Sequence, residues 1–402
     1  MMKIQRLYML LAILLAGVAL TASAPRAEAQ FGKLKEKLNK AAKPAATPEA
    51  AAAPRATSTP EEDVDATASK TPASSSTPLA APAIAWQKGA DMSPNSDDDL
   101  TTGVISFALA PDGTLYAGSK RVYASADGGK TWTTSTAGML DDPFRDVLAL
   151  AVSPKGTVFA SVREAGVWMS VDKGKTWKQS NPGEARKVPA FRDVVSLAVN
   201  AQGHVFAGTD NDGLFVSLDN GKTWKQSNQG LPKVLGKRNI HAIAFNAQGH
   251  VYLGMEDRSV QVSTDNGATW AYAGGGIDDW TKANTGTTDN TALSLAFAAD
   301  GSLVAGTYSG LFRTADGGKT WKHVGALRES VHRLALGKGG EMYALRKGND
   351  ARLWVSNDNG ATWAEANVPK VPGLFALAFT REGRLLAGAQ ETEGLHVYAA
   401  GK

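Results

Sequence analysis

A short motif recurs six times along this chain, and its spacing limits the folds that the chain can adopt. Each copy has eight residues in the pattern Ser/Thr-x-Asp-x-Gly-x-Thr-Trp, as in "SLDNGKTW" at residues 217–224. The copies, here called turn frames, begin at residues 125, 170, 217, 263, 314 and 356, so successive copies lie 42 to 51 residues apart. A period of this length indicates a repeat architecture, in which each repeat buries its apolar surface against its neighbours.

Each repeat contains the pattern of four short strands. Between residues 194 and 227, "VVSLAVNAQG" alternates into a polar turn, "HVFAGT" is a second strand, "GLFVSLD" a third, and "KTWKQS" a fourth. Four short antiparallel strands in a repeat of this length are typical of one blade of a β-propeller. The sequence therefore predicts an all-β fold.

The number of first strands exceeds the number of turn frames by one. Seven segments match the first strand: "ISFALAPDG", "VLALAVSPKG", "VVSLAVNAQG", "IHAIAFNAQG", "ALSLAFAADG", "VHRLALGKGG" and "LFALAFTREG". The missing fourth strand is available as "IAWQK" at residues 84–88, which resembles the "TWKQ" of two other repeats. We therefore predict a single seven-bladed β-propeller of four-stranded antiparallel blades over residues 84–402. An N-terminal strand would close it and remove an open sheet edge.

The first 29 residues have the features of a secretory signal peptide. Lys3 and Arg6 precede an apolar run from residue 7 to about residue 24, and the small-residue site Ala27-Glu28-Ala29 follows. We expect a cleavable signal and export to the periplasm or the cell exterior. The alternative is a retained membrane anchor, because the apolar run is near the length that spans a bilayer.

Residues 30–83 are predicted to connect the signal to the propeller. A short basic helix over residues 31–43, "FGKLKEKLNKAAK", would place Phe31, Leu34 and Leu38 on one face. It is interpreted either as a weak membrane-surface or partner-docking contact, or as a soluble start to the linker. The rest, rich in Ala, Pro, Ser and Thr, is predicted to be a disordered linker.

Charge and cysteine content exclude several classes of function. The chain has a formal net charge of +4, of which three units lie before residue 84, so the propeller is too balanced to bind nucleic acid mainly by neutralising phosphates. There is no cysteine, which excludes disulfides, thiolate metal ligands and an N-terminal lipid-modified Cys. The six histidines show no metal-binding spacing. We expect a monomer that uses no cofactor and no metal.

The turn frames resemble the Asp-box, also called the bacterial neuraminidase repeat. The Asp side chain can accept hydrogen bonds from backbone N–H groups of its own turn, the Gly can adopt a positive φ, and the Trp can cover the hairpin towards the neighbouring blade. We therefore interpret these residues as structural, the rival being a peripheral ion or sugar site. They are Asp127, Trp132, Asp172, Trp177, Asp219, Trp224, Asp265, Trp270, Asp316, Trp321, Asp358 and Trp363.

Candidate binding residues are expected on the face opposite the turn frames. This face, here called the top face, is formed by the links between blades and by the second-to-third-strand loops. Arg145, Arg192 and Arg238 each stand just before a first strand. They are expected to converge at the channel mouth and to bind an acidic group. The alternative is that Arg145 and Arg192 pair with the Asp that follows each of them, or cover strand ends.

Other candidates lie in loops. The longest link, "AGGGIDDWTKANTGTTDN", contains Asp278, Asp279 and Trp280, and an extended loop of this length is uncommon without a purpose. Trp280 could stack on a sugar or anchor a peptide, and the alternative is that it packs the loop. Tyr308 lies in a second-to-third-strand loop.

The resemblance implies two classes of function. Asp-box propellers include sialidases, xyloglucan-cleaving glycoside hydrolases, sortilin-like receptor ectodomains and non-catalytic propellers such as a photosystem II assembly factor. A glycosidase needs two carboxylates about 5 to 9.5 Å apart over its substrate, and the sequence singles out no such pair. We predict an exported non-catalytic binding or scaffolding propeller that engages a protein or glycan partner, one with an acidic group, through its top face. The alternative is an exported glycoside hydrolase, sialidase-like or xyloglucanase-like, that uses top-face carboxylates.

Overall fold

The computed structural model describes residues 84–91, 103–139, 146–180, 191, 193–233, 238–287, 289–324, 327–368, 373–391 and 394–400. The chain divides into two units, residues 1–74 and residues 75–402, and all described residues belong to the second unit. The segments expected to be a signal peptide (1–29), a basic helix (31–43) and a linker to residue 83 lie outside the described residues.

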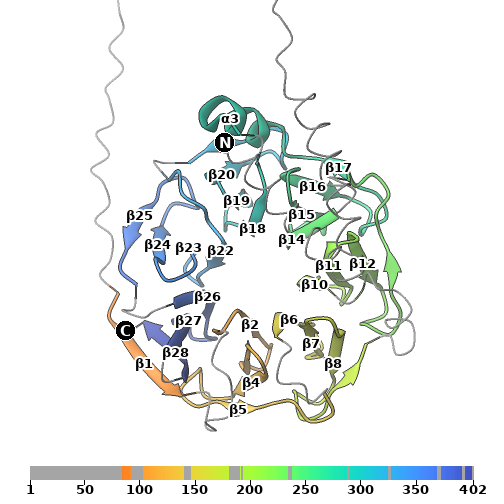
Figure 1. Ribbon diagram of the computed structural model, residues 1–402, viewed down its shortest axis with the longest axis vertical. Coiled ribbons are helices and arrows are strands. Elements are labelled where there is room, and N and C mark those ends of the chain that lie inside the picture. The colour runs from red at the N-terminus through yellow and green to blue at the C-terminus, as the bar shows by residue number, and fades with distance from the viewer. Residues whose placement is uncertain are drawn as a thin grey trace, which may run out of the picture. The chain divides into compact units, whose positions relative to one another are not determined.

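The second unit is a ring of antiparallel sheets around a central axis (Figure 1). One sheet holds β2 (Ser106–Leu109), β3 (Leu115–Gly118), β4 (Val122–Ser125) and β5 (Thr133–Thr134), and the next holds β6 (Val147–Val152), β7 (Val158–Val162), β8 (Gly166–Ser170) and β9 (Lys178–Gln179). An eight-stranded sheet holds β10 (Val194–Val199), β11 (Val205–Asn211), β12 (Leu214–Ser217), β13 (Lys225–Gln226), β14 (Arg238–Phe245), β15 (Val251–Met255), β16 (Val260–Ser263) and β17 (Ala271–Tyr272).

The ring continues with three four-stranded sheets. The first holds β18 (Ala292–Phe297), β19 (Leu303–Thr307), β20 (Gly310–Thr314) and β21 (Lys322–His323), and the second holds β22 (Arg333–Leu336), β23 (Met342–Arg346), β24 (Arg352–Ser356) and β25 (Ala364–Ala366). The last holds β26 (Gly373–Phe379), β27 (Leu385–Glu391), β28 (Gly394–Ala400) and β1 (Trp86–Asp91). This arrangement is a β-propeller.

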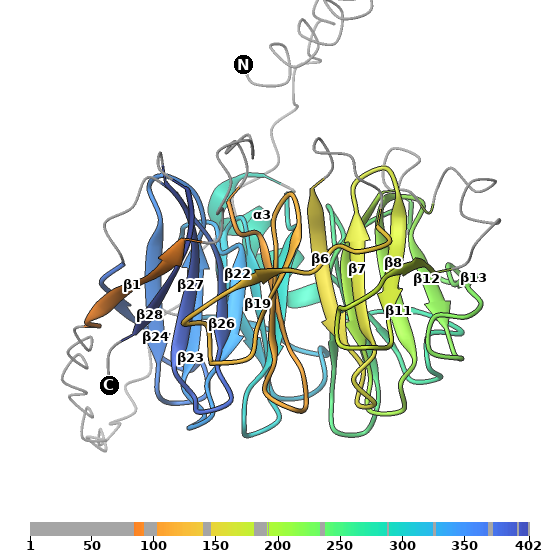
Figure 2. The same ribbon diagram turned by 90° about the horizontal axis from the view of Figure 1, so that it is seen from below.

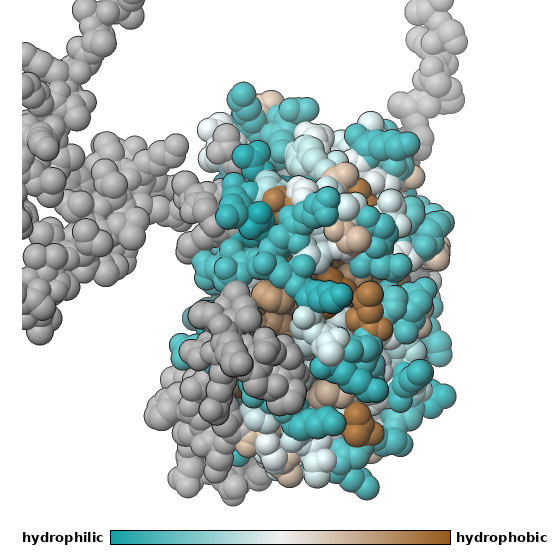
Figure 3. All heavy atoms as spheres, turned by 90° about the vertical axis from the view of Figure 1, so that its right-hand side faces the viewer, coloured by the Kyte–Doolittle hydropathy of each residue, from teal (hydrophilic) through white to brown (hydrophobic). Residues whose placement is uncertain are grey.

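Burial follows the position of each strand within its blade. Second strands such as β7 and β15 are buried at all five positions, because a neighbouring blade covers each of their faces. Fourth strands such as β5 and β13 are only two residues long, and both residues are exposed. Such short outer edges offer little backbone for pairing with another chain. The outer surface seen in Figure 3 is accordingly mostly hydrophilic, with scattered apolar side chains.

The pairing predicted between the two ends of the propeller is present. β1 pairs with β28, with Trp86 opposite Ala400 and Lys88 opposite Tyr398 (Figures 1 and 2). Asn367 secures the start of this strand, since its Oδ1 accepts a bond from the Ile84 N–H (2.6 Å) and its Nδ2 donates to the Ile84 carbonyl (2.7 Å). The Trp86 indole donates to the Asn367 carbonyl at 3.1 Å. The last sheet is therefore built from both ends of the propeller sequence.

The turn frames make the hydrogen bonds expected of their residues. In the third copy, Asp219 accepts bonds from the Thr223 N–H (2.8 Å), the Thr223 hydroxyl (2.6 Å) and the Ser217 hydroxyl (2.8 Å). Asn220 and Gly221 both have positive φ, 59° and 83°. The other five copies repeat this pattern around their own Asp. In every copy the carboxylate is bound within its own turn.

A serine joins several blades to the next turn frame. It lies three residues after the frame's Trp and donates its hydroxyl to a glycine carbonyl of the following frame. The pairs are Ser135 with Gly174 (2.5 Å), Ser180 with Gly221 (2.5 Å) and Ser227 with Gly267. The same hydroxyl accepts the indole N–H of that frame, as from Trp224 to Ser180 (3.0 Å). The frames therefore connect adjacent blades as well as closing hairpins.

One element departs from the expected all-β fold. The link predicted as an extended loop contains α3 (Gly275–Thr285), so that prediction is wrong. Ile277 and Thr281, one turn apart, are both fully buried, and Gly286 ends the helix in the left-handed conformation (φ 68°). Packing against the adjacent blade therefore stabilises a helix that local propensity did not reveal. No helix in the described part of the chain has the length and apolar composition needed to cross a bilayer.

Candidate binding site at the mouth of the axial channel

The first strand of each blade lines the axial channel. Each first strand begins at the top face and ends at the opposite face, here called the lower face (Figure 2). The second strand is antiparallel to it and returns to the top face. The turn frames join third to fourth strands and so lie on the lower face. The top end of the channel is surrounded by the starts of the first strands and by the second-to-third-strand loops.

A cavity of about 450 Å³ occupies this top end, here called the mouth. Its apolar lining comes from the starts of first strands, namely Ile105, Leu148, Val195, Leu293 and Phe375. Its polar lining consists of Asp146, Arg163, His241, Tyr308, His332, Arg333 and Lys347. These residues come from blades far apart in sequence and meet only because the ring closes around the axis.

Two histidines stand at a repeated apolar position. His241 and His332 align with Ile105 and Leu293 when the first strands are aligned on their terminal glycine turns. Burial lowers the pKa of His241. Burial also lowers the pKa of His332, to about 4, and the charges of Lys347 and Arg333 act in the same direction. Both rings are therefore neutral at neutral pH, and the buried Nδ1 of His332 has no hydrogen-bond partner.

Arg333 and Lys347 are the cations of the mouth that have no carboxylate partner within the described part of the chain. The Arg333 guanidinium donates one bond, to the His332 carbonyl at 3.0 Å. Lys347 remains accessible through the open mouth, but partial burial lowers its pKa and the Arg333 charge lowers it further. Burial likewise lowers the pKa of Arg333. Two neighbouring cations are thus partly desolvated and mutually repelling, an arrangement that a bound anion would relieve.

Two acidic groups in or beside the mouth are already bonded. Asp146 accepts two bonds from the Arg163 guanidinium, at 3.0 and 3.1 Å. Glu256, whose charge acts on His241, accepts a hydrogen bond from Asn239. The remaining donors, on Arg333 and Lys347, suit a planar carboxylate or a phosphate, since a guanidinium binds such groups with two parallel bonds.

The residues predicted from sequence do not gather in one place. Arg145 and Arg192 lie outside the described residues. Arg238 belongs to β14, opposite Asn211 of β11, and its Nε donates to the Leu231 carbonyl at 3.3 Å. It is not part of the mouth lining. Tyr308 does line the mouth, is 47% exposed, and meets the His332 ring edge-on at 6.4 Å.

Asp278, Asp279 and Trp280 belong to α3, away from the mouth lining. The Trp280 ring stacks on His323 with centroids 3.8 Å apart and meets Phe312 edge-on at 5.3 Å. Burial raises the pKa of Asp278, which accepts hydrogen bonds from Ser259, Tyr272 and Asn290. These contacts hold α3 against its neighbouring blades.

Sequence reasoning missed His241, His332, Arg333 and Lys347 as a group. A detectable signal was the replacement of an apolar residue by His at the same repeat position in two first strands. Lys347 follows a second strand, so only the ring geometry brings it beside Arg333. Within the described ranges, no group of three or more His, Asp or Glu residues is arranged to hold a metal ion.

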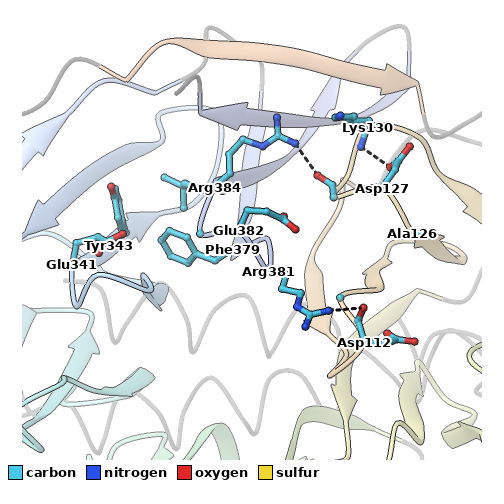
Figure 4. A pocket seen from close by; sticks show the side chains of 14 residues that line it. Asp112, Ala126, Asp127, Lys130, Glu341, Tyr343, Phe379, Arg381, Glu382 and Arg384 are labelled. Carbon is cyan, nitrogen blue, oxygen red and sulfur yellow. Dashed lines mark hydrogen bonds between the residues drawn. The ribbon is translucent and has the colours of Figure 1, made fainter.

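A second cavity, of about 750 Å³, opens on the lower face between the first and last sheets (Figure 4). Its lining carries both charge signs, and its guanidinium groups are bonded to backbone, Arg384 to the Gly128 carbonyl (2.9 Å) and Arg381 to the Asp112 carbonyl (3.3 Å). The Asp112 carboxylate pairs with Lys173 at 2.8 Å. The lining of this cleft contains four carboxylates, those of Asp112, Asp127, Glu341 and Glu382, whereas the lining of the mouth contains one.

Comparison with known protein families agrees with the fold. A sequence model of the DUF6242 β-propeller domain matches residues 235–376. The chain is also 30% identical over 110 residues to a xyloglucanase of Hypocrea jecorina (strain QM6a), a match that covers 23% of this chain and 13% of that protein. The chain thus spans a small part of the length of this curated relative.

Solved structures resemble nearly the whole ring. YCF48 bound to D1 peptide superposes with a TM-score of 0.58 at 17% identity, over 80% of this chain and 100% of that chain. The GH74 xyloglucanase from Xanthomonas campestris gives a TM-score of 0.55 at 17% identity, over 76% of this chain and 52% of that chain. The extracellular domain of a putative hybrid two-component system from B. thetaiotaomicron gives a TM-score of 0.59 at 14% identity, over 77% of this chain and 39% of that chain. At these identities the likeness shows the β-propeller fold alone.

Proposed function

We propose that this protein is an exported, non-catalytic binding or scaffolding propeller that engages an acidic group of a protein or glycan partner at the top mouth of its channel. The observation that carries the proposal is the pair of partly desolvated cations, Arg333 and Lys347, without a carboxylate partner among the described residues. An unpaired charge in such a place is costly, and a partner's anionic group would offset the cost.

The proposal includes a ring of seven blades of the Asp-box type. Counting the eight-stranded sheet as two blades joined through β11 and β14, the sheets hold seven groups of four strands. Membership of the Asp-box group is supported by the six frames and their repeated Asp, Ser and Thr hydrogen bonds. Export is supported by the signal-like residues 1–29, and the linker composition of residues 30–83 suits a tether.

The structural neighbours include both binding and enzymatic propellers. YCF48 is described as bound to a peptide, and the GH74 proteins are described as xyloglucanases. Hydrolysis remains the second candidate because of the match to a xyloglucanase. The mouth favours binding, since its lining includes one carboxylate, Asp146, which is bonded to Arg163. A glycosidase needs an acid and a base or nucleophile over its substrate.

The proposal is tested by partner capture together with a hydrolysis screen. The purified protein is immobilised and exposed to the secreted and envelope fractions of its source, and sialosides and β-glucans are assayed in parallel. We expect a stoichiometric partner, released by salt, that the double variant Arg333→Met/Lys347→Met fails to retain. The control, Lys338→Met, removes an exposed lysine beside the lower end of the channel and should retain the partner. Retention by the double variant, or sugar release that depends on a top-face carboxylate, would refute the binding proposal.

A further inference from the structure

The mouth continues downward into a second cavity, here called the throat. The throat has a volume of about 300 Å³, and its lining shares Ile105, Leu148, Val195, His241, Leu293 and Arg333 with the mouth. The two cavities are therefore contiguous along the axis, and Arg333 lies at their junction.

A ring of apolar side chains lines the throat, together with Ser106, Ser196 and Ser294. These apolar residues lie two positions further along the first strands than the residues of the mouth, because alternate residues of a strand share a face. They are Phe107, Leu150, Leu197, Ile243, Leu295, Leu334 and Leu377. Of the residues lining the throat, Arg333 alone carries a full charge at neutral pH. Unpaired positive charge thus stands beside a ring of apolar side chains.

From this juxtaposition we infer that the mouth and throat bind a carboxylate attached directly to an apolar group. The carboxylate pairs with Arg333 and Lys347, and the apolar group enters the throat between the first strands. An anion lacking an apolar group would leave the throat unfilled, and an apolar group lacking an anion would leave the cations unpaired. The inference rests on the proposed function, because it names the chemical group that the mouth recognises.

Two sources carry this chemistry. One is the C-terminus of a polypeptide with an apolar last residue, whose chain leaves through the top face. The other is a fatty acid. Their shared feature, a terminal carboxylate followed by an apolar group, is what the mouth and throat complement, and the source is an outcome of the experiment.

The experiment measures binding of defined probes to the full chain by isothermal titration calorimetry. The probes are acetate, hexanoate, hexanamide, decanoate, and the peptide acetyl-Gly-Ser-Gly-Ser-Val-Leu with a free or an amidated C-terminus. Each CH₂ buried from water contributes roughly a fourfold gain in affinity. We expect hexanoate to bind at least about tenfold more tightly than acetate and hexanamide. Arg333→Met and Lys347→Met should each weaken hexanoate by at least about tenfold, while Lys338→Met leaves it unchanged.

The outcomes separate this inference from the proposed function. Stronger binding of the free-acid peptide than of its amide identifies a polypeptide C-terminus, and binding of decanoate without the peptide identifies a fatty acid. Equal binding of acetate and hexanoate, equal binding of hexanamide, or no binding of any probe would overturn the inference. If a partner is still captured through Arg333 and Lys347 and hexanoate fails to displace it, the proposed function survives alone. Circular dichroism of each variant shows whether the ring is folded.

Discussion

Replacing Ser180 by Ala should measurably weaken the ring. Ser180 is 1% exposed, donates to the Gly221 carbonyl at 2.5 Å, and accepts the Trp224 indole N–H at 3.0 Å. The substitution leaves both partners without this hydroxyl, and each lost buried hydrogen bond costs roughly 1 kcal/mol. We therefore expect a loss of about 2 kcal/mol in the free energy of unfolding, or roughly 3 °C in melting temperature for a domain of this size.

The assay is urea unfolding followed by tryptophan fluorescence, with calorimetry as a second measure. A double-mutant cycle with Trp224→Phe isolates the indole–hydroxyl bond, and its coupling energy should be about 0.5–1 kcal/mol. If Ser180→Ala changes the free energy of unfolding by less than about 0.5 kcal/mol, the serine contact is not a stabilising connection between blades. The role given to the equivalent serines would then fail as well.

Three further predictions concern the frames and the closing strand. Hydrogen bonds from the Thr269 side chain and backbone hold the pKa of Asp265 at about 2, below its unfolded value near 3.9. The stability that this carboxylate contributes is therefore present above about pH 4 and is lost as pH falls towards 2. Asp265→Asn should flatten that part of a plot of urea midpoint against pH. Lys173 has a φ of 63° at a frame position that elsewhere holds Gly or Asn. At a salt concentration that screens its exposed pair with Asp112, Lys173→Asn should therefore raise the free energy of unfolding by roughly 0.5 kcal/mol, and a decrease in urea titrations at that salt concentration would contradict this. Asn367→Ala removes both side-chain bonds to Ile84 and should lower the free energy of unfolding by about 1–2 kcal/mol; an unchanged urea midpoint would show that these bonds do not hold the closing strand.

The architecture was predictable because its signals are local and repeated. Each turn frame encodes its own hairpin through an Asp, a Gly and a Trp, and alternation of apolar residues identifies the strands around it. The closing strand was predictable for the same reason, since the residues around Trp86 resemble the fourth-strand sequence of two other repeats. Because these patterns recur in several repeats, the copies can be compared with one another in the sequence.

The helix α3 shows where local signals fail. Its first residues are glycines, and the segment has the polar composition of a loop. What stabilises it is burial of Ile277 against a neighbouring blade and stacking of Trp280 on His323, a residue 43 positions further along the chain. Contacts of that range cannot be deduced from the helix's own sequence.

The candidate site depended on long-range geometry still more strongly. Arginines before the first strands were the expected binding groups, but Arg238 is engaged in pairing β14 with β11 and with the Leu231 carbonyl. Tyr308 was expected on the top face, and the structure places it in the mouth lining. No sequence pattern indicates that Arg333 and Lys347 lie close together, because Arg333 begins a first strand and Lys347 follows a second strand.

The sequence by itself determined the repeating strand order, the chemistry of each turn frame and the strand that closes the ring, because these depend on residues close together in the chain or on a period that repeats. Only the tertiary structure decided which side chains meet on the axis. Closing the ring brings His241, Tyr308, Arg333 and Lys347 into one cavity, above the throat. Their partial burial, their mutual repulsion and the absence of a described carboxylate partner are properties of that closed arrangement, and they are what make the mouth a candidate anion site.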